Sequence, residues 1–164
     1  MMKMKKKKKS FKPLTAGLGL LLILILFSKG GETAVAGQWV TLSISPGSIS
    51  FQADDPDLFP QVQANSPVLI TIRLPSSRNW SLYIRAEGNL VGDQGQIIPI
   101  STISWVASPK PPLLDGVLSA GQNIQVGSGR GRLFNGQLNF YFTNSWSYMA
   151  GTYTQVVTFS VMII

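Results

Sequence analysis

The sequence predicts an all-β protein: a single antiparallel β-sandwich of immunoglobulin-like type with seven or eight strands, preceded by an N-terminal signal helix. Two observations predict the sandwich. Apolar and polar residues alternate along short segments through most of the chain after residue 37, which is the pattern of strands with one buried face. Turn residues separate these segments at short intervals. A third observation, the composition of the first 36 residues, predicts the signal helix.

The first 36 residues have the layout of a secretory signal peptide. They contain eight of the 14 basic residues, followed by an apolar run from Leu14 to Phe27. As a helix this run would be about 21 Å long, which is shorter than the roughly 30 Å hydrocarbon core of a membrane. Ala34-Val35-Ala36 then fits a cleavage site before Gly37. We therefore expect a signal peptide at 1–36 and a β-sandwich domain at 37–164; an uncleaved anchor is the alternative.

The positive charge of the chain belongs to this leader. The formal net charge is +7, and the first 36 residues alone account for it, because six basic and six acidic residues balance from Gly37 onward. A basic protein would otherwise favour nucleic acid or an anionic surface as partner. We expect no nucleic-acid partner, membrane contact only through the leader, and export to the extracellular space or the cell surface.

The strands are predicted in order from the alternation and its interruptions. Asn135-Gly136, which lies between apolar residues, predicts a hairpin turn within the eighth segment. Gly127 to Arg132 is read as a turn, as is 76–79. The predicted strand segments are 38–45, 48–51, 68–75, 79–87, 97–100, 101–108, 117–127, 132–142 and 150–164, some of them short pieces of one strand.

The residues of ordinary catalytic and metal sites are missing. The chain contains no His and no Cys, which removes the usual general base, thiol nucleophile and zinc ligands. We predict a non-enzymatic protein without a cofactor. Asp54, Asp55 and Asp57 are the weak metal candidates, because Ca²⁺ binds several hard oxygens. The alternative is a solvated turn in which aspartate caps the backbone.

Aromatic residues are the other candidates for binding. Trp80 alternates in phase with Leu82 and Ile84, so we expect it in the core. Tyr83 and Tyr141 have the opposite phase, and an exposed aromatic ring can stack on a sugar. The alternative is that these tyrosines form cross-strand packing pairs.

The last segment, AGTYTQVVTFSVMII, is a strand that is apolar on both faces near its end. Tyr153, Val157 and Phe159 share one face, whereas Met162 and Ile164 make the other face apolar. A strand with one solvated face does not need these two residues. Either a loop of the same chain or another molecule is expected to cover them.

The stretch AGTYTQVVTFSV resembles the last strand of two families of exported bacterial β-sandwich. One is the spore coat protein U group, which includes pilins of the archaic chaperone–usher type. The other is the WxL cell-surface domain. Trp80-Ser81-Leu82 supplies a Trp-x-Leu sequence, and Phe159-Ser160-Val161 lies where the second would fall. The resemblance implies a sandwich exported to the cell surface, with contacts to sister subunits, other surface proteins or cell-wall polymer.

We therefore expect a non-enzymatic exported cell-surface or appendage structural protein that acts through protein–protein or cell-wall contacts. The alternative is a carbohydrate-binding module or adhesin that uses Tyr83, Tyr141 or a loop tryptophan. The residues expected to contact the partner or the wall are Trp80, Leu82, Phe159, Val161, Met162 and Ile164.

Overall fold

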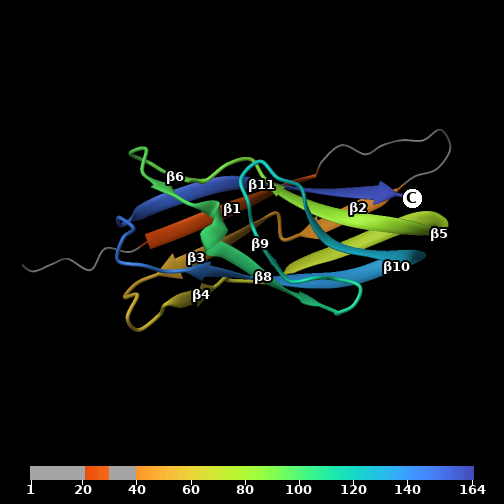
Figure 1. Cartoon of the computed structure of the whole chain (residues 1–164), viewed down its shortest axis with the longest axis horizontal. Helices are drawn as coiled ribbons and strands as arrows, with labels where there is room; N and C mark the ends of the chain where they lie inside the picture. Colours follow the sequence, from red (N-terminus) through yellow and green to blue (C-terminus); the bar gives the residue numbers. More distant parts are fainter. Residues whose placement is uncertain (1–20, 30–39) are drawn as a thin grey trace, which may run out of the picture.

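The computed structural model describes residues 21–29 and 40–164, and these residues confirm the all-β prediction (Figure 1). Within them lie eleven strands and one short 3-10 turn, η1 (Ile100–Thr102). The strands are β1 (Leu21–Lys29), β2 (Thr41–Ser45), β3 (Ser48–Ala53), β4 (Gln61–Gln63), β5 (Val68–Ala86), β6 (Leu90–Gly92), β7 (Ile97–Ile98), β8 (Ile103–Ser108), β9 (Gly116–Val117), β10 (Ile124–Thr143) and β11 (Gly151–Ile163).

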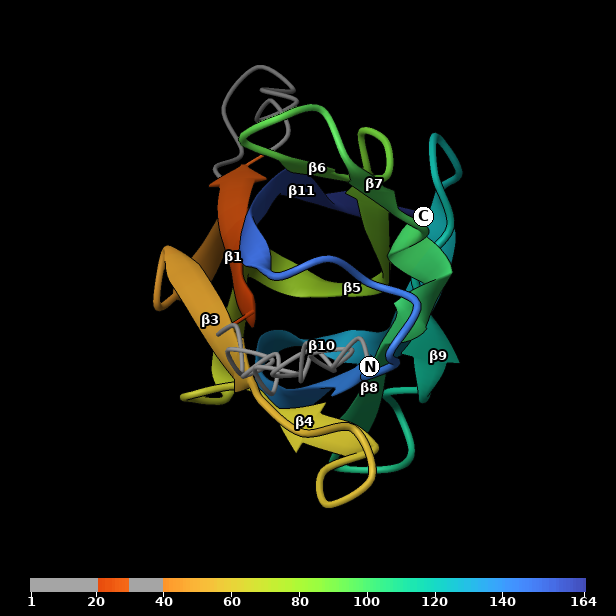
Figure 2. The same ribbon diagram turned by 90° about the vertical axis from the view of Figure 1, so that its left-hand side faces the viewer.

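All the described strands belong to one sheet, rather than to two separate sheets. Its main path is β3-β1-β11-β5-β10-β8-β9, with β2, β4, β6 and β7 paired at its sides. The pair β1–β11 is parallel and the other pairs are antiparallel, so the sheet is mixed. Viewed from one end, it curls around an apolar interior, with β1 and β3 along one side (Figure 2).

Two long strands make the sheet curl. The first half of β5 pairs with β2 and its second half with β11, while β10 pairs with β5 along both halves. The register between β5 and β10 shifts between Gly131 and Leu133, at the point where the ribbon bends. Each long strand therefore supplies two of the shorter strands that the sequence predicted.

Strands β5 and β10 fold back together within their length (Figure 1), and the ladder between them is irregular between Gly131 and Leu133, so the turns predicted at 76–79 and 127–132 are bends of a paired ribbon rather than breaks between strands. The hairpin turn predicted at Asn135-Gly136 is wrong, because both residues lie inside β10. Asn135 pairs with Thr71, whose Oγ1 donates a 2.9 Å hydrogen bond to Asn135 Oδ1. A Cβ at Gly136 would lie 2.7 Å from the Leu113 side chain. Asn135 therefore makes a cross-strand hydrogen bond, and Gly136 leaves room for the Leu113 side chain; the pair does not form a turn.

The signal helix predicted over 14–27 is corrected for the residues that the structure describes: 21–29 form strand β1. A run that is apolar throughout suits a strand paired at both edges as well as it suits a helix. Here β1 has a hydrogen-bonded neighbour on each side. The remainder of the predicted leader, 1–20 and 30–36, and the proposed cleavage site lie outside the described residues.

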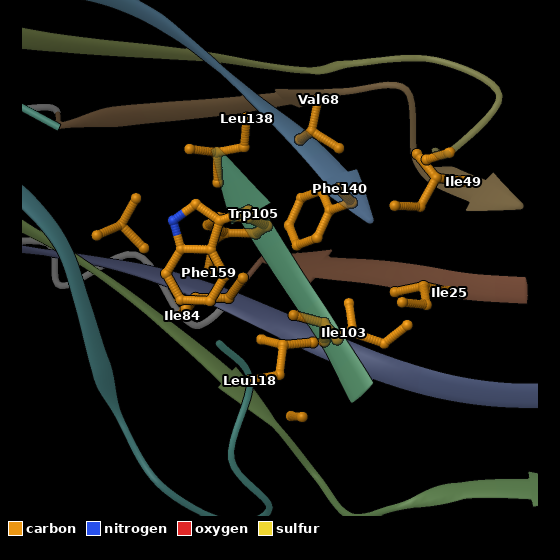
Figure 3. Packing of buried hydrophobic residues seen from close by; sticks show 14 of the residues in the cluster. Ile25, Ile49, Val68, Ile84, Ile103, Trp105, Leu118, Leu138, Phe140 and Phe159 are labelled. Carbon is orange, nitrogen blue, oxygen red and sulfur yellow. The ribbon is translucent and has the colours of Figure 1, made fainter. Parts of the chain in front are cut away.

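The core fills the interior of the curl and takes side chains from distant parts of the sequence. Ile25 of β1, Phe140 of β10 and Phe159 of β11 are all fully buried within it. Figure 3 shows Trp105 packed beside Phe140, with ring centroids 6.1 Å apart. The Trp105 Nε1–H donates a 2.8 Å hydrogen bond to the Leu114 carbonyl oxygen, which satisfies the buried indole.

Candidate functional site

Strand β1 occupies a position between β11 and β3, and we call this position the β1 slot. It pairs in parallel with β11 from Leu21↔Gly151 to Lys29↔Phe159, along all nine residues. It pairs antiparallel with β3 from Leu21↔Ala53 to Leu26↔Ser48. Among the described strands, β3 pairs with β1 alone. The segment that the sequence predicts as a leader therefore joins β3 to the rest of the sheet.

One face of β1 belongs to the core. Leu21, Ile23 and Ile25 are 5%, 0% and 0% exposed, whereas the intervening Leu22 and Leu24 have intermediate burial and the following Leu26 is 41% exposed. The Phe27 ring lies 5.9 Å from the Phe140 ring and 5.6 Å from the Phe159 ring, measured between centroids. Burying a leucine or isoleucine side chain contributes about 1.5–3 kcal/mol to the free energy of folding. The slot thus selects an extended segment with apolar residues at alternate positions.

Polar contacts at one end fix the register of β1. The hydroxyls of Ser28 and Thr158 lie 2.8 Å apart, and the Phe27 N–H donates a 2.9 Å hydrogen bond to the Gly47 carbonyl oxygen. A slip of one residue would turn Leu22, Leu24 and Leu26 inward and move the buried set to the outer face. It would also separate Ser28 from Thr158.

Removal of β1 would open the slot. Cleavage before Gly37 would leave β11 and β3 with unpaired backbone groups along the edges that β1 now occupies, and would expose the core side chains beneath it. Unpaired sheet edges readily pair with strands of other chains. Sequence analysis missed the slot because it interpreted the apolar run only as a signal helix. The alternation of buried and less buried residues in LLILIL becomes visible in the fold.

The residues predicted to contact a partner divide into two groups. Trp80, Leu82 and Phe159 are at most 2% exposed and belong to the core, as the alternation predicted for Trp80. Val161 is half-buried. Met162 and Ile164 are 57% and 76% exposed, so the expectation that a loop of the same chain covers them does not hold for the residues that the structure describes.

The tyrosines predicted to stack on glycans are only half exposed. Tyr83 and Tyr141 both have intermediate burial. Tyr141 lies in the middle of the sheet, paired with Gln63 on β4 and with Ser104 on β8, so its position suits cross-strand packing. Of the three tryptophans within the described residues, the exposed one is Trp146, at 61%, in the loop between β10 and β11.

The aspartates of the predicted calcium site form a turn. Asp55 Oδ1 accepts a 2.8 Å hydrogen bond from the Asp57 N–H, which is the backbone capping typical of aspartate in turns. Over residues 21–29 and 40–164, no three His, Cys, Asp or Glu residues are arranged to hold a metal ion. Asp54 lies beside Trp146, where both line a small pocket with Asn144 and Tyr148.

Among the described residues two titratable groups have perturbed pKa values, and one of them, Tyr153, lies on the β11 side of the slot, where it pairs with Ile23. The hydrogen bond from Lys110 Nζ, 2.7 Å long, lowers the pKa of the exposed Asp115, and the Ala107 N–H adds to this effect. Burial raises the pKa of Tyr153, whose hydroxyl donates a 2.9 Å hydrogen bond to the Met149 carbonyl oxygen. The slot itself is lined by apolar and neutral polar groups, which suit strand binding rather than acid–base chemistry.

No protein-family model matches this chain, and no curated protein is significantly similar to it. The described residues include no helix of the length and apolar character needed to cross a membrane. The slot and the surface of the sheet are therefore the features from which we infer a function.

Proposed function

We propose that this chain is a non-enzymatic structural subunit of the cell surface or of a surface appendage, and that it takes an extended strand of another molecule into the β1 slot. The observation that carries the proposal is the position of residues 21–29. The residues that the sequence predicts as the apolar run of a secretory leader form a strand paired at both edges of the sheet. Once the leader is cleaved, a different strand has to take this position.

The mature chain does not supply that strand from its own N-terminus. A chain that begins at Gly37 has four residues before Thr41, where β2 begins, and β2 already pairs with β5. The strand β1 is nine residues long. The replacement therefore comes from a partner, by addition of a strand to a sheet edge.

The proposal includes a more specific description of the fold. We interpret the curled sheet as an immunoglobulin-like sandwich that lacks one strand, with its two faces bridged through β5 and β10. The resemblance of AGTYTQVVTFSV to the last strand of exported pilin-like and WxL domains supports this interpretation. The strand with that sequence, β11, is the one that forms the long parallel ladder with β1.

The test is to isolate the protein from cells that export it and to determine its N-terminus by mass spectrometry. A photo-cross-linking residue in place of Thr158, whose side chain contacts β1 at Ser28, then reports what occupies the slot. We expect a chain that begins near Gly37 and is cross-linked to another polypeptide. A surface protein that keeps residues 21–29, cross-linked to its own Ser28 region, would contradict strand exchange. A matched variant with the cross-linker at the exposed Leu69 on β5 is expected not to capture the same strand.

Trp146 favours carbohydrate binding as the second candidate function. Its exposed side chain lines a small pocket together with Asp54 and Asn144, and aromatic faces with adjacent polar residues suit sugar rings. Titration with a panel of polysaccharides is expected to change the tryptophan fluorescence of the native chain but not of a Trp146→Phe variant. If no glycan changes the spectrum, the carbohydrate-binding function is contradicted and only the structural role remains.

A further inference from the structure

The two ends of the sheet are far apart and differ in composition. Strand β11 runs between them, and its 13 residues span about 43 Å at roughly 3.3 Å per residue. Its first residue, Gly151, follows the loop 144–150, which is joined to the connection 54–60 by hydrogen bonds from Asn144 Nδ2 to the Asp54 and Phe59 carbonyl oxygens. At its other end, Ile163 pairs with Trp80, and the Ile164 N–H donates to the Asn79 carbonyl oxygen (Figure 1).

One end, which we call the acidic end, carries Asp54, Asp55, Asp57 and Asp93. The first three lie between β3 and β4, and Asp93 follows β6, whose Gly92 pairs with Tyr153 near the start of β11. Exposed apolar side chains lie among them: Leu58 is 71% exposed and Phe59 is 56% exposed. The cationic side chains that the structure describes lie elsewhere, on β5, on β10 and after β8.

The other end, which we call the basic end, carries Arg78, Arg130 and Arg132. Arg130 pairs with Asn79 and Gly131 with Arg78, so the arginines lie on adjacent strands. Arg78 and Arg130 line a shallow pocket together with Ile164. The exposed Met162 and Ile164 lie at this end. In the described part of the chain the one ion pair is Lys110–Asp115, so no described acidic side chain pairs with these arginines.

We infer that the acidic end of one copy docks against the basic end of a second copy, head to tail. Opposite charges attract across such a contact, whereas two acidic ends or two basic ends repel each other, so the charges select this orientation. Leu58 and Phe59 then cover Met162 and Ile164, which the chain itself leaves exposed. A head-to-tail contact leaves one free end of each kind, so it repeats and builds open chains of copies. This contact uses neither β1 nor the slot and is independent of strand exchange.

The experiment uses the full chain and two variants that each reverse one end. The acid-reversed variant carries Asp54→Lys, Asp57→Lys and Asp93→Lys, and the base-reversed variant carries Arg78→Glu, Arg130→Glu and Arg132→Glu, so that each end changes the sign of its net charge. Sedimentation velocity at low salt is expected to show self-association of the native chain, which weakens at about 0.5 M NaCl because salt screens the charges. Each variant alone is expected to associate at least tenfold more weakly. An equimolar mixture of the two is expected to recover association, since every contact is then between opposite charges.

The control is Arg85→Glu, an exposed arginine in the middle of the β5–β11 ladder, which is expected to associate like the native chain. Circular dichroism checks the fold of each variant, and a misfolded variant is replaced by one that has asparagine at the same aspartates or glutamine at the same arginines, which is also expected to associate more weakly than the native chain. A native chain that stays monomeric at low salt would overturn the inference. A mixture that associates no better than its separate components would also overturn it.

Discussion

At the scale of single residues, neighbouring positions on β1 have opposite environments. Ile25 is fully buried beneath the sheet, and the next residue, Leu26, is 41% exposed on the outer face. The two residues are both aliphatic and nearly equal in size. Truncating each of them in turn therefore distinguishes the stability gained by burial beneath β1 from the stability gained by any apolar side chain on this strand.

We predict that Ile25→Ala lowers the free energy of unfolding of the full chain by about 2–5 kcal/mol, the usual cost of truncating a buried aliphatic side chain. Leu26→Ala is expected to cost less than about 1 kcal/mol, because exposed positions tolerate truncation. Urea denaturation followed by tryptophan fluorescence measures both values. Equal losses at the two positions would show that β1 does not hold this register.

Tyr153 leads to a prediction about alkaline pH. It is 1% exposed, and burial raises its pKa above the ordinary value of 10.0. Because the folded state resists ionisation of the phenol, this group leaves stability unchanged below the unfolded pKa and lowers it as the pH rises above about 10. Melting temperatures between pH 8 and 11 are expected to fall less steeply for Tyr153→Phe than for the native chain. Tyr83→Phe, at a half-buried position, is the control, and an identical slope in all three proteins would refute the assignment.

The sequence located residues well where burial follows alternation. Trp80 was predicted in the core, and it is 2% exposed, in contact with Phe134 at 4.8 Å between ring centroids. It left open whether a loop of the same chain or another molecule covers Met162 and Ile164, because alternation identifies the face of a strand but not what covers that face. Nor did it predict the pocket at Trp146, which forms where two loops meet.

At the scale of elements, the sequence predicted most strand segments but not their continuity. Residues 76–79 and Asn135-Gly136 have turn composition, yet they continue β5 and β10. What decides between turn and strand is the surroundings: Gly129 and Gly136 accommodate the Trp80 ring and the Leu113 side chain at distances that a Cβ would not allow. These neighbours are remote in sequence, so a local pattern does not reveal them.

The apolar run of 21–29 shows the same limit. A short continuous apolar segment suits a buried helix or a strand with neighbours on both sides, and periodicity does not distinguish them. Its lysine-rich flank favoured the signal helix. The partners that make it a strand, β3 and β11, lie 22–32 and 130 residues further along the chain.

We predict that a chain beginning at Gly37 is much less stable than the full chain. Loss of Leu21, Ile23 and Ile25 alone removes three buried aliphatic side chains, together worth about 5–9 kcal/mol, which is comparable with the total stability of a typical domain. Chemical denaturation and binding of an apolar dye measure the change. A chain that begins at Leu14 keeps β1 and is the control. If the chain from Gly37 unfolds at the same denaturant concentration as the control, the slot contributes nothing to the fold.

At the scale of the whole molecule, the slot and the two charged ends are independent means of association. The slot accepts a strand along the side of the sheet between β11 and β3, whereas the acidic and basic ends meet along its long axis (Figures 1 and 2). A subunit with both features can receive a strand from one partner in the slot and dock end to end with another copy. In the proposed role both features bind polypeptide, as in a structural protein.

The central claim is that the β1 slot accepts an extended segment in trans, and strand exchange in a nicked chain tests it most directly. A protease site placed within 30–39 of the full chain is cut after folding, and a fluorescent peptide of residues 19–30 with a solubilising lysine tail is added in excess. We predict that the peptide replaces the original strand and co-elutes with 40–164 in size-exclusion chromatography. The same peptide with Ile23→Ser and Ile25→Ser is expected not to bind. If neither peptide enters the protein, even in denaturant just below the unfolding midpoint, or if both enter equally, the claim is contradicted.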